Sequence, residues 1–209
     1  MLQVSDIPIS IDTRHARVAY EAIIAGADIV NDVSGGTFDP EMLSTVAKLK
    51  VPIILMHMKG TPETMQTMTD YDDVVSEVAN SLLERMYMAE KAGIPRWLQV
   101  VDPGIGFAKD LHGNLSLIKN FGTLRNMVNH MPILLGPSRK GFIGKITGEM
   151  KPEERDFGTA AACLVALNNE FNAFGNSSRI HKQCSIVRVH NVKGVKQAMM
   201  IMEALNKAK

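Results

Sequence analysis

Short apolar runs alternate with helical patterns along the chain, and this alternation limits the possible fold more than any other feature. The six apolar runs are residues 7–11, 28–33, 51–56, 97–101, 132–135 and 185–189. The six stretches with helical spacing are residues 15–26, 39–48, 72–93, 115–129, 153–172 and 192–207. Strands that alternate with helices predict an α/β fold with a parallel sheet. The runs are apolar on both faces, which indicates that both faces of the sheet are buried.

Polar residues follow nearly every apolar run and help to choose between two parallel architectures. An open doubly wound sheet gathers functional groups at one switch point, whereas a barrel turns the carboxyl end of every strand toward one face. The polar residues at the run ends are Asp12, Asn31, Asp32, His57, Asp102, Ser138, Arg139, Lys140, Arg188 and His190. Their presence after all six runs favours the barrel, and the open sheet is the alternative.

The number of βα units indicates how much of a barrel the domain contains. A complete TIM-type (β/α)8 barrel has eight units and about 250 residues, whereas this sequence shows six units in 209 residues. We therefore predict an α/β fold of the (β/α)8 type, truncated to about six βα units, in one domain over residues 1–209. The polar segment 168–182 is predicted to be a long connection before the last strand.

Charge and hydropathy exclude several classes of partner. The chain has 23 basic and 22 acidic residues and a formal net charge of +1, which argues against the basic field that binds nucleic acid. No apolar run approaches the roughly 20 residues of a membrane span, and the first residues resemble neither a secretory signal nor a transit peptide. Cys163 and Cys184 are expected to be reduced thiols, with one disulfide as the alternative. These features predict a soluble intracellular protein.

The loop after the fourth run carries the most specific chemistry in the sequence. The segment Asp102-Pro-Gly-Ile-Gly-Phe-Ala-Lys109 brings a carboxylate, an aromatic face and a cation into one tight turn. It contains no GxGxxG pattern and so does not indicate a dinucleotide site. We interpret Asp102, Phe107 and Lys109 as functional residues rather than as parts of a purely structural turn.

The first three strand ends give weaker signals, and each has a structural alternative. Asp12 offers a carboxylate to the N–H donors of a flat heterocycle, but it also suits the N-cap of the next helix. Asn31 offers a donor and an acceptor from one amide, although a plain loop explains it equally well. A lone His at a strand end is more often a structural residue than a catalytic one, so a structural role is expected for His57.

The last two strand ends gather donors suited to an anion. Ser138, Arg139 and Lys140 follow the fifth run, and Arg188 and His190 project to the same face of the last strand because they are two residues apart. The last two βα loops are the usual phosphate site of a barrel. We predict a phosphate or pyrophosphate site here, with solvated loop charges as the alternative.

In their order and spacing, these motifs resemble those of the dihydropteroate synthase family. The resemblance runs over about residues 7–206 and rests on Asp12-Thr-Arg, Asn31-Asp-Val-Ser-Gly-Gly, Met56-His-Met, Asp102-Pro-Gly-Ile-Gly-Phe, Ser138-Arg-Lys-Gly-Phe-Ile-Gly and Arg188-Val-His-Asn. It implies a (β/α)8 fold and a transferase of folate biosynthesis. Such an enzyme joins 4-aminobenzoate to 6-hydroxymethyl-7,8-dihydropterin diphosphate and releases pyrophosphate.

The resemblance also implies a role for each candidate residue. The implied pterin-binding residues are Asp12, Asn31, Asp102 and Lys140. The implied diphosphate-binding residues are Arg188 and His190, which together with Lys140 are the implied catalytic residues. The residues implied on the aminobenzoate side are Phe107, Ser138 and Arg139. The resemblance implies Mg²⁺ through the substrate diphosphate, with no metal ligand among these side chains.

The sequence departs from the family pattern at its start. The family's first two βα units, which include an Asn that contacts Mg²⁺ or diphosphate and two mobile loops, precede the Asp-Thr-Arg strand and are not found here. We therefore expect a chain that lacks these units, and we keep a weakly active or inactive pterin-binding chain as an alternative. A methyltetrahydrofolate-binding methyltransferase barrel is a second alternative, although it would not need the Ser138 and Arg188 motifs.

The expected partners follow from the same resemblance. They are the two small-molecule substrates, without nucleic acid or membrane, and a homodimer is an allowed assembly. The expected location is the cytoplasm, or the mitochondrion for part of a plant-type bifunctional enzyme.

Overall fold

Six short parallel strands form the centre of the structure, a computed structural model that describes residues 6–61, 63–167 and 184–208. The strands are β1 (Ser10–Asp12), β2 (Ile29–Asp32), β3 (Ile53–Met56), β4 (Gln99–Asp102), β5 (Leu134–Leu135) and β6 (Ile186–Val187). Every strand lies within one residue of a predicted apolar run. The prediction of a parallel α/β fold is therefore confirmed.

At least one helix follows each strand, and the observed bounds differ from the prediction at residues 115–129 and 141–147. The helices are α1 (Ala16–Ile24), α2 (Met42–Leu49), α3 (Val74–Lys91), α4 (Leu111–Lys119), α5 (Phe121–Met127), α6 (Gly141–Thr147), α7 (Asp156–Leu167) and α8 (Val192–Lys207). Short 3₁₀ turns lie at Met65–Thr67, Arg96–Leu98 and Pro152–Arg155. The predicted connection 168–182 and the predicted end of the helix at 168–172 lie outside the described residues.

The predicted single helix over 115–129 is wrong in its start and in its continuity. Asp110 caps a helix that begins at Leu111, because its carboxylate accepts the backbone N–H of Gly113 at 2.7 Å. Asn120 separates α4 from α5, and its side-chain amide donates to the carbonyl of Ser116 at 2.9 Å. Helix α6 was not predicted, because a seven-residue helix with two glycines is too short to show a periodic pattern.

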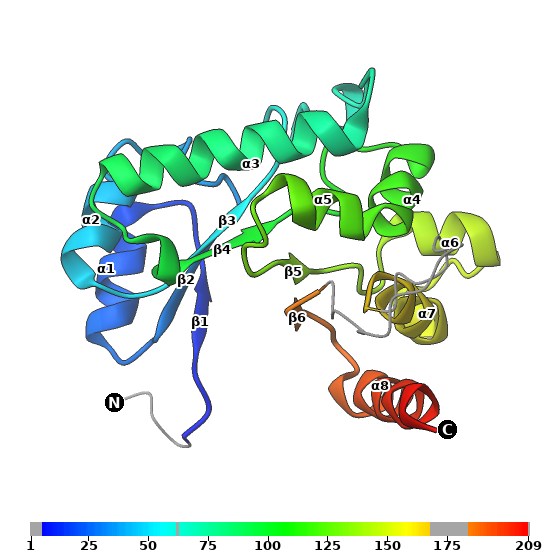
Figure 1. The fold of residues 1–209 in the computed structure, drawn as a ribbon. Coiled ribbons are helices and arrows are strands. Elements are labelled where there is room, and N and C mark those ends of the chain that lie inside the picture. The colour runs from blue at the N-terminus through cyan, green and yellow to red at the C-terminus, as the bar shows by residue number, and fades with distance from the viewer. Residues whose placement is uncertain (1–5, 62, 168–183, 209) are drawn as a thin grey trace.

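The strands pair in the order of the sequence. Parallel pairing joins β1, β2, β3 and β4, and a second pair joins β5 to β6. A bridge between Val101 and Ile133 links β4 to the second pair. Figure 1 shows the row of strands with helices beside it, from α1 and α2 near β1 and β2, past α3, to α7 and α8 near β6. Among the described strands, the order has none of the reversal that defines a doubly wound sheet.

The core lies between the strands and the surrounding helices. The helix predicted over 72–93 is confirmed as α3, and one stripe of it is buried, at Val74, Val75, Val78, Leu82, Met86 and Ala89. On the strands, Ile53, Leu55 and Val101 belong to the same core as this stripe. Side chains alternate between the two faces of a strand, so Asp102 projects to the opposite face. Cys163 and Cys184 are both buried and free.

Candidate functional site

The carboxyl ends of the strands bring several predicted site residues to the face opposite the helix-facing core. Strand pairing places Asp12 beside Asn31 and Met56 beside Asp102. Arg188 follows β6, and its backbone N–H donates to the carbonyl of Leu135 at 2.9 Å. Residues distant in sequence therefore meet at one edge of the sheet.

These residues form the strand-end cluster, which comprises Asp12, Asn31, Asp102, Phe107, Lys140 and Arg188. Asp12 and Asn31 are its first pair. The side-chain N–H of Asn31 donates to the carboxylate of Asp12, which orients the Asn31 amide. The side-chain oxygen of Asn31 is buried and accepts no hydrogen bond among the described residues. A buried acceptor without a donor is costly to a folded protein. Asn31 therefore presents an acceptor that suits an N–H group of a ligand.

Asp102 and Arg188 form the second pair. The Asp102 carboxylate is 1% exposed, accepts the N–H of Gly104 at 2.8 Å and accepts Nη2 of Arg188 at 3.2 Å. Burial raises the pKa of Asp102, while Arg188 and the Gly104 N–H act in the opposite direction. Nη1 of Arg188 is buried and has no acceptor among the described residues. This pair therefore combines an ionisable buried acceptor with an unused guanidinium donor.

Lys140 and Phe107 lie beside this second pair. The ammonium of Lys140 lies 4.0 Å from the centroid of the Phe107 ring, which is a cation–π contact. Burial and the charge of Arg188 lower the pKa of Lys140, whereas Asp102 and Asp12 raise it. Lys140 therefore carries its charge in a partly buried position, between the cation of Arg188 and the carboxylates of Asp102 and Asp12 in electrostatic effect.

Ser138 and His190 tie the last two strand-end loops together. The backbone N–H of His190 donates to the Ser138 hydroxyl at 3.1 Å, and the same hydroxyl lies 2.8 Å from Nδ1 of His190. Because the hydroxyl accepts the backbone N–H, it is free to donate its own proton to Nδ1. The Ser138 hydroxyl therefore joins the loop after β5 to both the backbone and the ring of His190.

Arg139 directs its side chain to the first residue of α7. Its guanidinium donates to both carboxylate oxygens of Asp156, at 2.8 and 3.0 Å, and this bidentate bond raises the pKa of Arg139. Asp156 starts α7, on the helix side of the strand end. The structure therefore commits the Arg139 side chain to an ion pair, and its role beside the aminobenzoate stays a prediction.

Asp32 and Arg85 organise the loops rather than the cluster. The Asp32 carboxylate accepts the backbone and hydroxyl protons of Ser34, at 2.8 and 2.6 Å, and the N–H of Gly36 at 2.7 Å. Arg85, buried on α3, donates to the carbonyls of Ser34, Met56 and Met58. The sequence analysis missed Arg85, although its spacing of three from Leu82 places it on the buried stripe of α3.

His57 and Lys109 form a buried pair behind the cluster. Nζ of Lys109 lies 3.0 Å from Nδ1 of His57, and both side chains are at most 5% exposed. Burial lowers the pKa of His57 to about 2, and the charge of Lys109 adds to this effect. Burial also lowers the pKa of Lys109 to about 7, although Asp102 opposes the change. His57 therefore stays neutral at ordinary pH, in agreement with a structural role.

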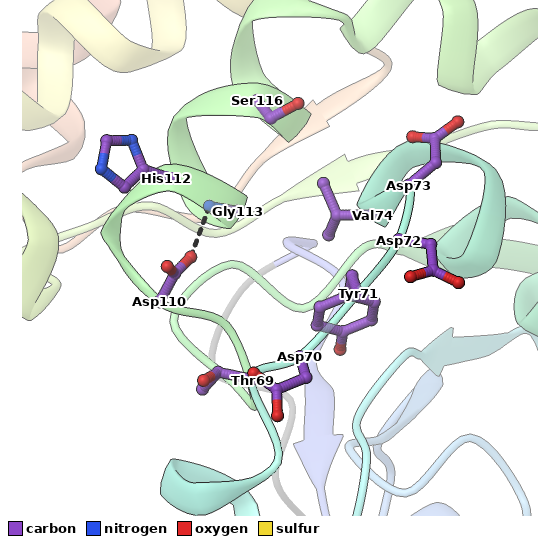
Figure 2. Close-up of a pocket in the computed structure, with 10 residues that line it drawn as sticks. All are labelled: Thr69, Asp70, Tyr71, Asp72, Asp73, Val74, Asp110, His112, Gly113 and Ser116. Atoms are coloured by element: carbon purple, nitrogen blue, oxygen red, sulfur yellow. Dashed lines mark hydrogen bonds between the residues drawn. The ribbon is translucent and has the colours of Figure 1, made fainter.

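A separate cavity lies next to these loops. It has a volume of about 350 Å³ and lies between residues 69–74 and the start of α4. Figure 2 shows its lining side chains, among them Tyr71, His112 and four aspartates. None of the predicted site residues lines this cavity.

The described part of the chain has no group of three or more His, Cys, Asp or Glu side chains placed to hold a metal ion. Across residues 6–61, 63–167 and 184–208, no helix is both long enough and apolar enough to cross a membrane.

The chain as a whole is similar to known proteins. The sequence profile of the family described as "Pterin binding enzyme" matches residues 1–174. The chain is 46% identical over 190 residues to folic acid synthesis protein fol1 of Pneumocystis carinii, with 90% of this chain and 24% of that protein covered. It is 44% identical over 200 residues to dihydropteroate synthase of Synechocystis, with 96% of this chain and 64% of that protein covered.

A solved structure shows the same arrangement of elements. Dihydropteroate synthase of Xanthomonas albilineans with 4-aminobenzoic acid matches at a TM-score of 0.84 and 35% identity. The match covers 98% of this chain and 67% of that one. The chain thus spans from about a quarter to about two thirds of the length of these relatives.

Proposed function

Because this chain belongs to the pterin-binding enzyme family, we propose that it acts as a dihydropteroate synthase of folate biosynthesis. The reaction joins 4-aminobenzoate to 6-hydroxymethyl-7,8-dihydropterin diphosphate and releases pyrophosphate. One observation carries the proposal: the buried Asp102 carboxylate is paired with Arg188, and on the same face of the sheet Asn31 has an oxygen that accepts no hydrogen bond in the described structure.

The pterin ring fits the acceptors of the cluster. A 2-aminopyrimidinone edge presents N–H donors next to a carbonyl acceptor. Asp102 accepts the N–H donors, Asn31 offers its free oxygen to another N–H, and Lys140 serves the acceptor side. Asp12 supports this arrangement by holding the Asn31 amide in place.

The diphosphate fits the cations at the last two strand ends. The amine of 4-aminobenzoate attacks the methylene carbon, a C–N bond forms, and the C–O bond to the diphosphate breaks. The electron pair of the broken bond leaves with the pyrophosphate, and the amine gives up a proton to solvent. Arg188 and His190 stabilise the charge that develops on the leaving oxygen. Phe107 and Ser138 lie on the aminobenzoate side.

The proposed function also implies a complete barrel fold and a Mg²⁺ ion. We infer that the six units are part of a (β/α)8 barrel, which the sequential strand order and the coverage of 67% of the Xanthomonas chain support. The described residues do not fit a metal site held by the protein. We therefore propose that Mg²⁺ arrives with the substrate diphosphate, and no step above depends on it.

A pyrophosphate-release assay on the 209-residue chain tests the activity. Release is expected when both 4-aminobenzoate and the pterin diphosphate are present, and no release is expected from the diphosphate alone. A second version, which carries two additional N-terminal βα units taken from the Synechocystis relative, is assayed beside it. Pterin binding without release in both versions would overturn the proposed activity and favour a non-catalytic pterin-binding chain.

Replacing Arg188 with alanine tests the anion site. The variant loses one charge-assisted contact, so inorganic pyrophosphate should bind about 1.5–3 kcal/mol more weakly. Isothermal titration calorimetry measures this affinity. Arg125→Ala is the control, because Arg125 lies on α5, away from the strand ends. An unchanged pyrophosphate affinity in Arg188→Ala would place the anion elsewhere.

A further inference from the structure

Lys109 uses all of its hydrogen-bonding capacity inside the protein. Its side chain is 5% exposed, and lysine is seldom buried so deeply without partners. Nζ donates to the carbonyls of Gly104 and Phe107, at 3.1 and 2.9 Å, and lies 3.0 Å from Nδ1 of His57. An ammonium group has three N–H donors, so three partners satisfy it completely.

The two carbonyls bound by Lys109 belong to a loop with an uncommon backbone. Gly104, Gly106 and Ala108 all have positive φ, of 67°, 81° and 49°. A side chain on Gly104 would collide with the carbonyl of His57. Without partners, such a segment has no regular secondary structure to hold it. The bonds from Lys109 hold the two carbonyls of this loop, while Asp102 and Asn114 accept the N–H groups of Gly104 and Gly106.

This loop carries the aromatic ring against which Lys140 packs. The Phe107 carbonyl is bound by Lys109, and its ring lies 4.0 Å from Nζ of Lys140. Gly106 also approaches the Lys140 stem, because a Cβ there would lie 2.9 Å from Cδ of Lys140. Lys140 is thus placed by the loop as well as by its own strand end.

We propose that Lys109 is a positioning residue of the site: by binding the Gly104 and Phe107 carbonyls, it fixes the Phe107 ring and, through the ring, the Lys140 ammonium. The inference deepens the proposed function and rests on it for the catalytic consequence alone. It assigns a role to the buried Lys109 side chain, which takes no part in the proposed reaction steps.

The surrounding contacts support a positioning role over a direct one. Tyr71 binds the same loop, because its hydroxyl donates to the Ala108 carbonyl at 2.8 Å. Figure 2 shows Tyr71 among the residues that line the cavity between residues 69–74 and the start of α4. Lys109 and Tyr71 therefore both donate to backbone carbonyls of this loop.

A ligand-free measurement tests the placement of Lys140. The Phe107 ring should shift the NMR signals of the Lys140 side-chain methylene protons upfield, and Phe107→Leu gives the value without a ring. In Lys109→Met, the shift is expected to fall by at least about half. Lys91→Met is the matched control, because the Lys91 ammonium lies 5.2 Å from the Tyr87 ring at the surface. An unchanged Lys140 shift in Lys109→Met would overturn the proposal.

Lys109→Arg separates the proposed role from a loss of folding in Lys109→Met. Arginine keeps the charge and can donate to two carbonyls at once, so this variant should retain most of the Lys140 shift. If the shift is lost in Lys109→Arg while the thermal midpoint stays within a few degrees of the wild type, the proposal is wrong.

A double-mutant cycle tests the catalytic consequence. Lys109→Met is expected to raise KM for 4-aminobenzoate about tenfold in the wild-type background and less than about twofold in a Phe107→Ala background. Additive effects in the cycle would mean that Lys109 does not act through Phe107. Absence of turnover in the wild-type chain would count against the proposed function, while the NMR shifts would still decide the role of Lys109.

Discussion

Replacing Asp102 with alanine is expected to weaken pterin binding by about 2–5 kcal/mol, which is about thirtyfold to several thousandfold. The carboxylate is buried and paired with Arg188 at 3.2 Å. Its loss removes the acceptor for the ring N–H donors and leaves the Arg188 guanidinium without its partner. Calorimetry with a pterin ligand measures the change in affinity.

Asp32→Ala is the matched control for this prediction. Asp32 is also buried at a strand end, but its carboxylate binds Ser34 and Gly36 in the following loop. Its loss should lower stability and leave pterin affinity within a few-fold of the wild type once the folded fraction is taken into account. Equal losses of affinity in the two variants would contradict the assignment of Asp102.

Replacing Arg85 with methionine is expected to lower the free energy of unfolding by about 3–5 kcal/mol. The guanidinium donates to the carbonyls of Ser34, Met56 and Met58, which follow or end two neighbouring strands. Methionine fills much of the same volume but leaves these acceptors without a donor. Urea unfolding followed by circular dichroism measures the change.

Two further variants make the Arg85 result specific. Arg85→Lys keeps the charge without the forked geometry and should lose an intermediate amount of stability. Arg96→Met removes a surface arginine that pairs with Glu90 at 2.8 Å, and it should cost less than about 1 kcal/mol. A loss in Arg85→Met as small as that in Arg96→Met would show that water satisfies the three carbonyls.

The strands and the long helix could be predicted from the sequence because their signals are local. The buried stripe of α3 repeats at spacings of three and four, and each strand is a short apolar run. The break at Asn120 and the short helix α6 could not be predicted in the same way. Both depend on single side-chain contacts or on neighbouring elements rather than on a repeating pattern.

The site could be predicted in part for a similar reason. The alternation of side chains along a strand already separates Asn31 from Asp32, so one faces the cluster and the other faces the loop. The sequence could not show that Asp156 occupies the Arg139 guanidinium or that Lys109 contacts His57. These contacts join residues 17 and 52 positions apart, and only the folded chain brings them together.

The sequential pairing of the strands bears on the order in which the chain acquires its structure. Strand β1 pairs with β2, and β2 pairs with β3, so these three strands can pair while later residues are still being synthesised. Strand β6 closes a much longer connection onto β5, and long connections are slower to close. The Arg188–Asp102 contact, across 86 positions, therefore forms late. A nascent chain should bury its first strands well before it is able to hold an anion.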